Sequence, residues 1–538
     1  MMRAEPSTLA DDSMLRAVSP SGLKAMLADG LELAILDLRE ELIFSGAHLL
    51  WARSVPLSRL ELLVARLVPR RGTRIVLCDA ANGPVERAAE RLRRFGYTDL
   101  FCLGGGIAAW AEAGFELFSG VNVPSKAFGE FIEHAAGTPS IAAEELERWL
   151  HTGADVVVLD SRPLEEYARM SIPTAINVPG AELVLRARDV ARSPETTVVV
   201  NCAGRTRSII GAQSLINAGL PNKVVALRNG TMGWQLAGFA CESGNSRRAT
   251  DISASGLAWA KSAASRVASR YGIEHIDAAT LKSWQQDRER TLYLFDVRDP
   301  DEYRAGHVAG AVSAPGGQLV QATDQYIGTL GARIVLVDDA EVRALMTASW
   351  LRQMGFRDVF VLAERGSETE FPKPPVLGFA PRPELEIRPA ELDTLLAREG
   401  ATVIDLSLSR AYRRAHIPGA WFAIRSRLER ALAAIPLREK WVLTSEDGIL
   451  AGLAVPELSA LTDLPVRYLA GGNAAWSAAG LPLAAGEDRM ADEAVDVWLR
   501  PYEQPRAATA AMTEYLTWET DLLPRLDRDG TARFRGPG

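Results

Sequence analysis

The sequence predicts an α/β protein made of four tandem units, each with a mostly parallel sheet flanked by helices. Three observations support this: a motif that recurs four times, a second apolar run about forty residues after each copy, and helical patterns between the apolar runs. Strands that alternate with helices at this spacing are typical of parallel sheets covered by helices on both faces. The length of 538 residues agrees, since at about 150 residues per domain it corresponds to roughly three or four domains.

The first strand of each unit is an apolar run that ends in Asp, followed eleven residues later by a His or its substitute. The four copies are Leu36-Asp37-Leu38-Arg39 with His48, Leu159-Asp160-Ser161-Arg162 with Ser171, Phe295-Asp296-Val297-Arg298 with His307, and Ile404-Asp405-Leu406-Ser407 with His416. We expect the Asp and Arg of each copy to pair with one another or with the backbone and so fix the sheet edge. Because the three His belong to separate units at a shared spacing, no metal site is predicted.

The second strand of each unit is again an apolar run, and a helical pattern follows it. These runs are Arg74-Ile75-Val76-Leu77, Thr197-Val198-Val199-Val200, Arg333-Ile334-Val335-Leu336-Val337 and Trp441-Val442-Leu443, with helices expected, for example, at 85–95 and 209–218. A short strand and a Gly-rich turn closed by Trp come next in units one, two and four, at Gly104-Gly105-Gly106 to Trp110, Asn229-Gly230-Thr231 to Trp234 and Gly471-Gly472-Asn473 to Trp476. The third unit lacks this ending and continues into Ala363-Glu364-Arg365-Gly366.

These repeats set the domain boundaries that we predict. The units span residues 12–120, 138–243, 272–366 and 384–486, and a C-terminal tail covers 487–538. Residues 244–270 are expected to form a polar linker leading into a helix, and the Pro-rich run 370–375 an extended spacer. The sequence leaves open whether the tail wraps an adjacent domain or is only partly ordered.

Composition excludes several classes of protein. The net charge is −8 with no long block of like charge, so a nucleic-acid partner is not expected. No apolar run approaches the roughly 20 residues of a membrane span, and the acidic start lacks the features of a secretory signal. The four cysteines contain no CxxC pair, which excludes a disulfide scaffold and a zinc motif of that type. We therefore expect a cytoplasmic protein whose thiols stay reduced.

The loop after the second strand of unit two carries the best candidate for chemistry. Cys202 lies where the strand ends and a helix begins, Gly204 permits a tight turn, and Arg205 and Arg207 are close by. Backbone amides, the positive end of the helix dipole and two guanidinium groups all favour the thiolate, which is the nucleophilic form of cysteine. The same cradle would hold a small anion.

Two motifs resemble those of the rhodanese family. Residues 296–311, Asp-Val-Arg-Asp-Pro-Asp-Glu-Tyr-Arg-Ala-Gly-His-Val-Ala-Gly-Ala, look like the first motif of rhodanese domains, and residues 201–208, Asn-Cys-Ala-Gly-Arg-Thr-Arg-Ser, look like their active-site loop. With the Gly-rich turns closed by Trp, the resemblance covers most of residues 12–485 and extends to the bacterial thiosulfate sulfurtransferases with four rhodanese domains. It implies four rhodanese-like domains, each with a mostly parallel five-stranded sheet.

The resemblance also implies a ping-pong sulfur transfer. Thiolate Cys202 attacks the outer sulfur of thiosulfate, sulfite leaves, and the resulting persulfide gives its sulfur to cyanide or a cellular thiol. Arg207 would bind the sulfonate and stabilise the persulfide, with Arg205 assisting. The backbone amides of the loop would cradle the anion, which makes Ala203, Gly204, Thr206 and Ser208 predicted substrate-binding residues. No metal or organic cofactor is required.

The remaining cysteines and loops receive lesser roles. Cys78 lies 41 residues after Asp37, close to the 42 that separate Cys202 from Asp160, so we interpret it as the equivalent position in a degenerate loop and as a candidate second thiol, serving sulfur relay or surviving as a remnant. Cys102 and Cys241 are expected to be structural. The matching positions are Asp338 in unit three and Thr444 or Ser445 in unit four. We expect neither loop to keep an Arg in place, so both units are predicted to be non-catalytic.

Two alternatives to the enzyme remain open. In the first, the protein is a persulfide carrier or scaffold whose units three and four dock a partner enzyme of thiol metabolism. In the second, more distant one it is a phosphatase or arsenate reductase, although those loops place five residues between Cys and Arg, whereas only four separate Cys202 from Arg207. The sequence does not identify the donor, the acceptor or the oligomeric state.

Overall fold

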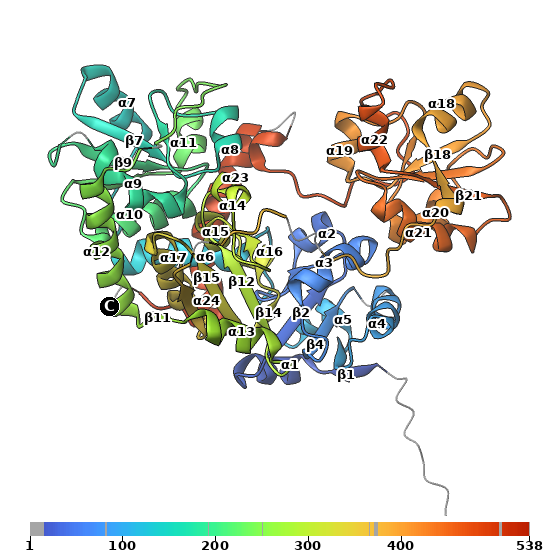
Figure 1. Cartoon of the computed structure of the whole chain (residues 1–538), viewed down its shortest axis with the longest axis horizontal. Helices are drawn as coiled ribbons and strands as arrows, with labels where there is room; N and C mark the ends of the chain where they lie inside the picture. Colours follow the sequence, from blue (N-terminus) through green and yellow to red (C-terminus); the bar gives the residue numbers. More distant parts are fainter. Residues whose placement is uncertain are drawn as a thin grey trace, which may run out of the picture.

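The computed structural model describes residues 15–80, 83–191, 193–249, 251–364, 366–370, 375–504 and 508–536. Four sheet-containing units lie in the spatial order two, three, one, four, with unit two (cyan) and unit four (orange) at opposite ends (Figure 1). Parts of several expectations fall outside the described residues, among them the start of the first domain at 12–14, Arg365 in the ending of unit three, the core of the Pro-rich spacer at 371–374, and residues 505–507 and 537–538 of the tail. No described helix is both long and apolar enough to cross a bilayer.

Unit one contains the largest sheet. Its strands are β1 (Arg16–Val18), β2 (Leu33–Asp37), β3 (Arg53–Ser54), β4 (Ile75–Cys78) and β5 (Leu100–Leu103), and its helices are α1 (Pro20–Ala28), α2 (Glu41–Gly46), α3 (Leu60–Leu67), α4 (Pro84–Arg94) and α5 (Gly106–Glu112). Along β2 and β4, Leu33, Ile35 and Val76 enter one core cluster while Ala34, Leu36, Ile75 and Leu77 enter another. Successive strand residues thus bury opposite faces, which explains why the strands are apolar throughout.

Unit two follows the linking helix α6 (Val123–Ala136). Its strands are β6 (Ser140–Ile141), β7 (Val156–Asp160), β8 (Ile176–Asn177), β9 (Thr197–Asn201) and β10 (Val224–Leu227), and its helices are α7 (Ala143–Thr152), α8 (Leu164–Arg169), α9 (Leu183–Val190), α10 (Thr206–Ala218) and α11 (Gly230–Leu236). The order across the sheet is β6-β10-β9-β7-β8. The carboxyl ends of β7 and β9, at the centre of the sheet, therefore bring Asp160 and the Cys202 loop together.

Unit three begins after α12 (Ala254–Tyr271), the helix expected to follow the polar linker. Its strands are β11 (Glu274–His275), β12 (Leu292–Asp296), β13 (Val312–Ser313), β14 (Thr329–Leu330), β15 (Arg333–Val337) and β16 (Val359–Leu362), and its helices are α13 (Ala278–Gln286), α14 (Pro300–Ala305), α15 (Gly316–Gln321), α16 (Thr323–Tyr326) and α17 (Val342–Gln353). One strand of this unit, β14, leaves its own sheet and pairs antiparallel with β2 of unit one. Units one and three thus share a sheet.

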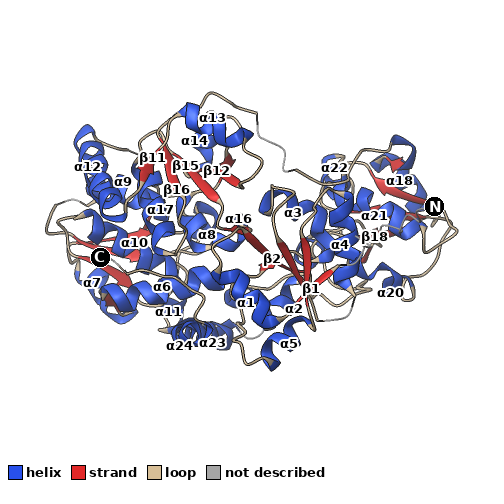
Figure 2. Cartoon of the chain, turned by 90° about the horizontal axis from the view of Figure 1, so that it is seen from below, coloured by secondary structure: helices blue, strands red, loops and turns tan. Residues whose placement is uncertain are grey.

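Unit four repeats the pattern at the far end of the molecule. Its strands are β17 (Glu386–Ile387), β18 (Thr402–Asp405), β19 (Trp421–Phe422), β20 (Trp441–Thr444) and β21 (Val466–Leu469), and its helices are α18 (Pro389–Ala397), α19 (Ser409–Arg414), α20 (Leu428–Leu432), α21 (Ile449–Ser459) and α22 (Gly472–Ala478). Helices lie on both faces of the sheets (Figure 2). The predicted α/β class with four mostly parallel sheets is confirmed, and β14 is an added sixth strand in the sheet of unit one.

The Asp–Arg pair of the repeated motif forms in units one, two and three. In unit two, Arg162 donates to both carboxylate oxygens of Asp160, at 2.9 and 2.7 Å, and its third hydrogen bond goes to the carbonyl of Met170 at 2.6 Å. Arg39 and Arg298 make the same contacts in their units. In unit four Ser407 replaces the Arg and donates its amide to Asp405. The pair fixes the chain that leaves the strand.

Units two and three face each other about a pseudo-two-fold relation. Arg207 of unit two pairs with Glu166 of its own unit and with Gln318 of unit three. Arg343 of unit three correspondingly pairs with Glu302 of its own unit and with Glu182 of unit two. The backbones of the two units approach closely at Gly180 and Gly317. A Cβ on Gly180 would lie 3.2 Å from the Cα of Gly317, so the absence of side chains here lets units two and three come into contact. The third unit therefore borders the Cys202 loop.

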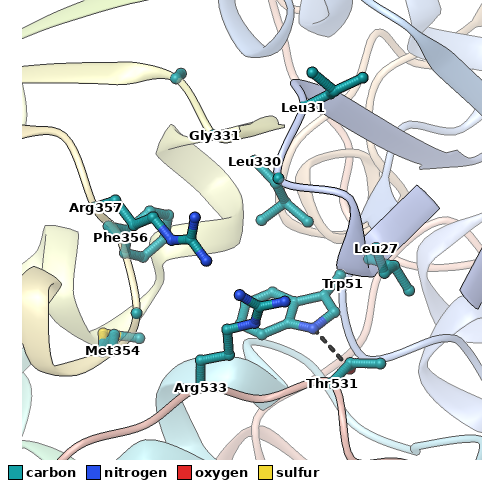
Figure 3. Close-up of a pocket in the computed structure, with 13 residues that line it drawn as sticks. Leu27, Leu31, Trp51, Leu330, Gly331, Met354, Phe356, Arg357, Thr531 and Arg533 are labelled. Carbon is teal, nitrogen blue, oxygen red and sulfur yellow. Dashed lines mark hydrogen bonds between the residues drawn. The ribbon is translucent and has the colours of Figure 1, made fainter. Parts of the chain in front are cut away.

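The C-terminal segment runs back from unit four across the other units (Figure 1). It forms α23 (Ala508–Thr520), which packs on α6 and α11, and α24 (Leu522–Asp529), which packs on α6. Thr531 and Arg533 of this segment line a hollow of about 110 Å³ between units one and three, where the indole of Trp51 donates to the hydroxyl of Thr531 at 2.9 Å (Figure 3). The segment thus holds the units together rather than extending from the molecule.

Burial of His48 predicts a pH-dependent stability for unit one. Burial, which outweighs hydrogen bonds to the carbonyls of Leu49 and Gly120, lowers the pKa of His48 to about 4. In the unfolded chain the imidazole takes up its proton near pH 6.5, whereas in the folded protein it stays neutral down to about pH 4. The contribution of His48 to the free energy of unfolding is therefore fully present above pH 6.5. It decreases by up to about 3 kcal/mol as the pH falls toward 4. Native-state hydrogen exchange of β2 at pH 7.5 and pH 5 measures this loss.

A His48→Gln variant should show a much smaller difference between the two pH values, because it has no imidazole to titrate. The exposed His151→Gln serves as the control and should keep the full pH dependence of the parent protein. Equal pH dependence in the parent and in His48→Gln would contradict the assignment.

Candidate active site

Strand register identifies the position equivalent to Cys202 in each unit. Asp160 pairs with Asn201 across β7 and β9, so Cys202 is the first residue beyond the pair. In unit one, Asp37 pairs with Cys78 itself, and the first residue beyond is Asp79. The expectation that Cys78 matches Cys202 is wrong by one residue, because the spacing of 41 was taken as equivalent to 42, whereas the strand pairing places Asp79, 42 residues after Asp37, at the position of Cys202. The same register selects Asp338 in unit three and Ser445 in unit four.

The first residues of α11 bind the Cys202 loop through its backbone carbonyls. The amide of Thr231 donates to the carbonyl of Cys202 at 2.8 Å, and the amide of Met232 donates to the carbonyl of Ala203 at 2.9 Å. The hydroxyl of Thr231 adds a second bond to the Cys202 carbonyl at 3.0 Å. Among the described residues, the amides from Ala203 to Ser208 donate to no protein acceptor. The loop therefore presents a row of free donors at the N-terminus of a 13-residue helix.

Gly230 makes this arrangement sterically possible. Its φ of +53° is in the left-handed region, and a Cβ built on it would lie 2.4 Å from the Cys202 carbonyl oxygen and 2.7 Å from that of Gly204. Any side chain would push the loop away from α11. The Gly-rich turn predicted from the repeat thus serves to support the loop that precedes it.

In unit three, the equivalent loop binds an anion that belongs to the protein itself, the side-chain carboxylate of Asp338. The carboxylate of Asp338 accepts hydrogen bonds from the amides of Ala340, Arg343 and Ala344, at 3.1, 2.7 and 3.3 Å. These residues correspond to Gly204, Arg207 and Ser208 of unit two. The guanidinium of Arg343 contacts the same carboxylate at 2.9 Å. The expectation that unit three keeps no Arg in place is therefore wrong, since Arg343 stands five residues after Asp338, as Arg207 does after Cys202.

Arg207 lies at the wall of the Cys202 cavity. Its guanidinium binds Glu166 with two hydrogen bonds, at 3.2 and 2.8 Å, and donates to Gln318 at 3.2 Å. Burial tends to raise the pKa of Glu166, but Arg207 and then Arg500 outweigh it and lower this pKa to about 2. Glu166 is therefore ionised at neutral pH and fixes the orientation of Arg207. The two guanidinium groups of Arg207 and Arg500 face this single carboxylate, so the three groups together carry one net positive charge.

Arg205, which the sequence analysis predicts to assist in substrate binding, is paired with carboxylates of α6. Its guanidinium forms a bidentate pair with Glu130 of α6, with both distances 2.7 Å, and also pairs with Glu133. A further hydrogen bond of 3.2 Å reaches Asn229 at the start of α11. Arg205 lines the cavity, yet its charge is matched by two carboxylates. It ties the loop to the linking helix, and the other cations that line the cavity are Lys126, Arg207 and Arg500.

The cavity above Cys202, about 130 Å³, is closed by residues that the sequence analysis missed. Cys202 itself is 1% exposed, and its thiol donates to Ser208 Oγ at 3.5 Å. Unit three contributes Gln318, Gln321, Gln325 and Tyr326, the segment before α6 and α6 itself contribute Asn122 and Lys126, and the C-terminal segment contributes Trp498, Arg500, Tyr502 and Tyr515. None of these lies in a repeated motif, so no sequence signal singled them out.

Burial disfavours ionisation of the other three thiols. Burial, followed by the charge of Asp37, raises the pKa of Cys78 well above its ordinary value. Burial also raises the pKa of Cys241 to about 11 and raises that of Cys102. Cys78 belongs to the hydrophobic core of unit one, in the cluster with Val76 and Trp110.

Comparisons with known proteins agree with the repeat. The family model of the rhodanese-like domain matches residues 19–113, 142–237, 277–364 and 388–479. The crystal structure of a thiosulfate sulfurtransferase from Pseudomonas aeruginosa is 48% identical, covers 97% of this chain and 100% of that one, and superposes with a TM-score of 0.94. Among curated proteins, YrkF of Bacillus subtilis, named as a candidate sulfur carrier protein, is 24% identical over 24% of this chain and 72% of its own length. An uncharacterized protein of Synechocystis is 35% identical over 17% of this chain and 49% of its own length.

The buried Arg205–Glu130 pair predicts a large stability effect. Arg205→Met leaves the carboxylate of Glu130, which is 4% exposed, without its main partner and should reduce the free energy of unfolding by about 3 kcal/mol or more. The double variant Arg205→Met/Glu130→Met should regain most of that loss, because both charges are then absent. Arg16→Met breaks an exposed pair with Asp99 and should cost less than about 1 kcal/mol. Urea denaturation measures all three, and equal costs for the two single variants would refute the structural role of Arg205.

Proposed function

The chain belongs to the rhodanese-like family, and from this premise we propose that it is a sulfurtransferase that moves sulfane sulfur from thiosulfate, through a persulfide on Cys202, to cyanide or a thiol. The observation that carries the proposal is the cradle at Cys202: its loop has six free amides, and three of them, with the Arg207 guanidinium, stand at positions whose equivalents in unit three bind the Asp338 carboxylate. The similar Pseudomonas aeruginosa protein, named for its thiosulfate sulfurtransferase activity, supports the choice of donor.

In the first half-reaction, the Cys202 thiolate attacks the outer sulfur of thiosulfate. A bond forms between the two sulfur atoms, the bond between the outer sulfur and the sulfonate sulfur breaks, and sulfite departs with the electron pair. Arg207 binds the departing sulfonate oxygens, since a guanidinium forms strong charge-assisted hydrogen bonds with oxyanions. Glu166 and Gln318 hold that guanidinium in place.

In the second half-reaction, the persulfide carries its negative charge on the outer sulfur. The amides from Ala203 to Ser208 donate to this sulfur, as the equivalent amides of unit three donate to the Asp338 carboxylate. The acceptor, cyanide or a thiolate, attacks the outer sulfur and Cys202 leaves as a thiolate. Ala203, Gly204, Thr206 and Ser208 thus bind through the backbone, Arg207 binds through its side chain, and Arg205 positions the loop.

The remaining units have structural roles in this proposal. Asp338 and Ser445 occupy the nucleophile position in units three and four, and neither provides a thiol. Cys78 does not serve as a second site, because it lies in a core cluster and Asp79 stands at the equivalent position. We place the protein in a reducing compartment such as the cytoplasm, where all four cysteines, each free in the structure, remain thiols.

Mass spectrometry tests the covalent step directly. Incubation with thiosulfate should add one sulfur atom to the intact protein, and peptide mapping should place it on Cys202. Cys202→Ser should gain no sulfur and lose at least about a thousandfold in kcat, since no other thiol lies in the cradle, whereas Cys78→Ser should gain the sulfur normally. A sulfur adduct on Cys78 in the parent protein, or unchanged turnover by Cys202→Ser, would refute the assignment.

Substitution of Arg207 tests how the donor is held. Arg207→Lys keeps the charge but loses the planar pair of donors, and kcat/KM for thiosulfate should fall about 10- to 100-fold. The matched control is Arg343→Lys, the equivalent change in the cradle of unit three that carries no thiol, and it should change kcat/KM by less than about threefold. Equal losses in the two variants would show that the effect comes from packing between the units.

A further inference from the structure

A second, larger chamber adjoins the cavity of Cys202. It encloses about 780 Å³, and the two share four residues at their boundary, Glu166, Gln318, Arg500 and Tyr502. The boundary is a polar partition: Arg500 donates to the hydroxyl of Tyr502 at 2.9 Å and lies 3.5 Å from Glu166. Any molecule in the outer chamber is therefore one layer of side chains from the cavity that holds the thiol.

The sizes of the two spaces point to different ligands. Sites for organic ligands of drug-like size measure about 300–1,000 Å³. The outer chamber, at about 780 Å³, falls within this range, and the inner cavity, at about 130 Å³, falls below it. The inner cavity thus accommodates a small inorganic anion, and the outer chamber accommodates an organic molecule as large as a short peptide.

The chamber lies between unit two and the C-terminal segment, and Gln318 of unit three completes its lining. Ala508, Thr509 and Met512 of α23 line it, and so do Arg169 and Met170 at the end of α8. Arg169 pairs with Glu503 at 3.0 Å, yet its side chain is 60% exposed, so its guanidinium remains accessible to a ligand. Glu165 adds an exposed carboxylate on the same side. Cations, a carboxylate and apolar Met side chains together suit an amino-acid-derived molecule with charges of both signs.

We propose that the outer chamber is the acceptor subsite and binds a peptide-sized organic thiol that carries carboxylates, with Arg169 and Arg500 as their partners. The inference rests on the function proposed above and assigns the second substrate of that reaction to residues outside the rhodanese loop. The thiolate of the bound acceptor reaches past the partition and attacks the outer sulfur of the Cys202 persulfide. The bond from that sulfur to Cys202 Sγ breaks, Cys202 leaves as a thiolate with the electron pair, and the acceptor departs as a persulfide.

A blocking variant tests the proposal with two acceptors of different size. Thr509→Trp places an indole in the outer chamber without altering any residue of the inner cavity. With thiosulfate as the donor and glutathione as the peptide-sized probe, KM for glutathione should rise at least tenfold. With cyanide as the acceptor, kcat and KM should stay within about twofold of the parent protein, which also shows that the variant is folded.

Two further variants sharpen the test. Thr513→Trp lies one turn along the same exposed face of α23 but does not line the chamber, and should leave both acceptors unaffected. Arg169→Gln should raise KM for glutathione about fivefold and leave KM for uncharged 2-mercaptoethanol unchanged.

Equal effects of Thr509→Trp on cyanide and glutathione, no effect on either, or cyanide transfer by a parent protein that does not use glutathione would each overturn the acceptor subsite while leaving the sulfurtransferase intact. Failure of the parent protein to transfer sulfur to any acceptor would instead refute the proposed function, and the subsite with it.

Discussion

The candidate site depends on one constraint, the capture of the Cys202 and Ala203 carbonyls by the first amides of α11. With these two carbonyls bound to α11, the amides of Ala203 to Ser208 have no protein acceptor among the described residues. The constraint continues into the sheet, because Thr231, which holds the Cys202 carbonyl, accepts a hydrogen bond from Asn201, and Asn201 donates also to Asp160. The strand-ending Asp, the Gly-rich turn and the loop therefore form one connected support.

Because the unit is repeated, the Cys202 loop can be compared with the equivalent loops of the other units. The same support is present in units one and four, where Ile107 and Asn473 donate to the carbonyls of Asp79 and Ser445. The residue at the position of Cys202 changes, to a carboxylate in units one and three and a hydroxyl in unit four. The Arg five residues later is kept in unit three but replaced by Pro84 in unit one and Leu450 in unit four. In unit three the carboxylate takes the amides that an external anion would need. This explains physically how a rhodanese-like unit can keep its fold and its Arg and still have no room for a substrate anion.

Much of the fold could be predicted, because the features that determine it are local in sequence. Apolar runs ending in Asp became β2, β7, β12 and β18, and the Asp–Arg pairing and the helix after Cys202 formed as expected. The errors arose where pairing between distant segments decides the outcome. Cys78 was misplaced because a difference of one residue in spacing decides which residue ends the strand pair, and β14 was missed because its partner β2 lies almost 300 residues away.

The sequence by itself determined the four units, the single suitable loop and the nucleophile that we propose for it, because a strand, a tight turn and a helix start are adjacent in the chain. Only the tertiary structure decided what surrounds that nucleophile. The pairing of units two and three brought Gln318 to Arg207, and the return of the C-terminal segment brought Arg500, Tyr502 and Tyr515 over the cavity. These side chains come from segments without any repeated motif. Their place depends on how whole surfaces pack, which no local pattern encodes.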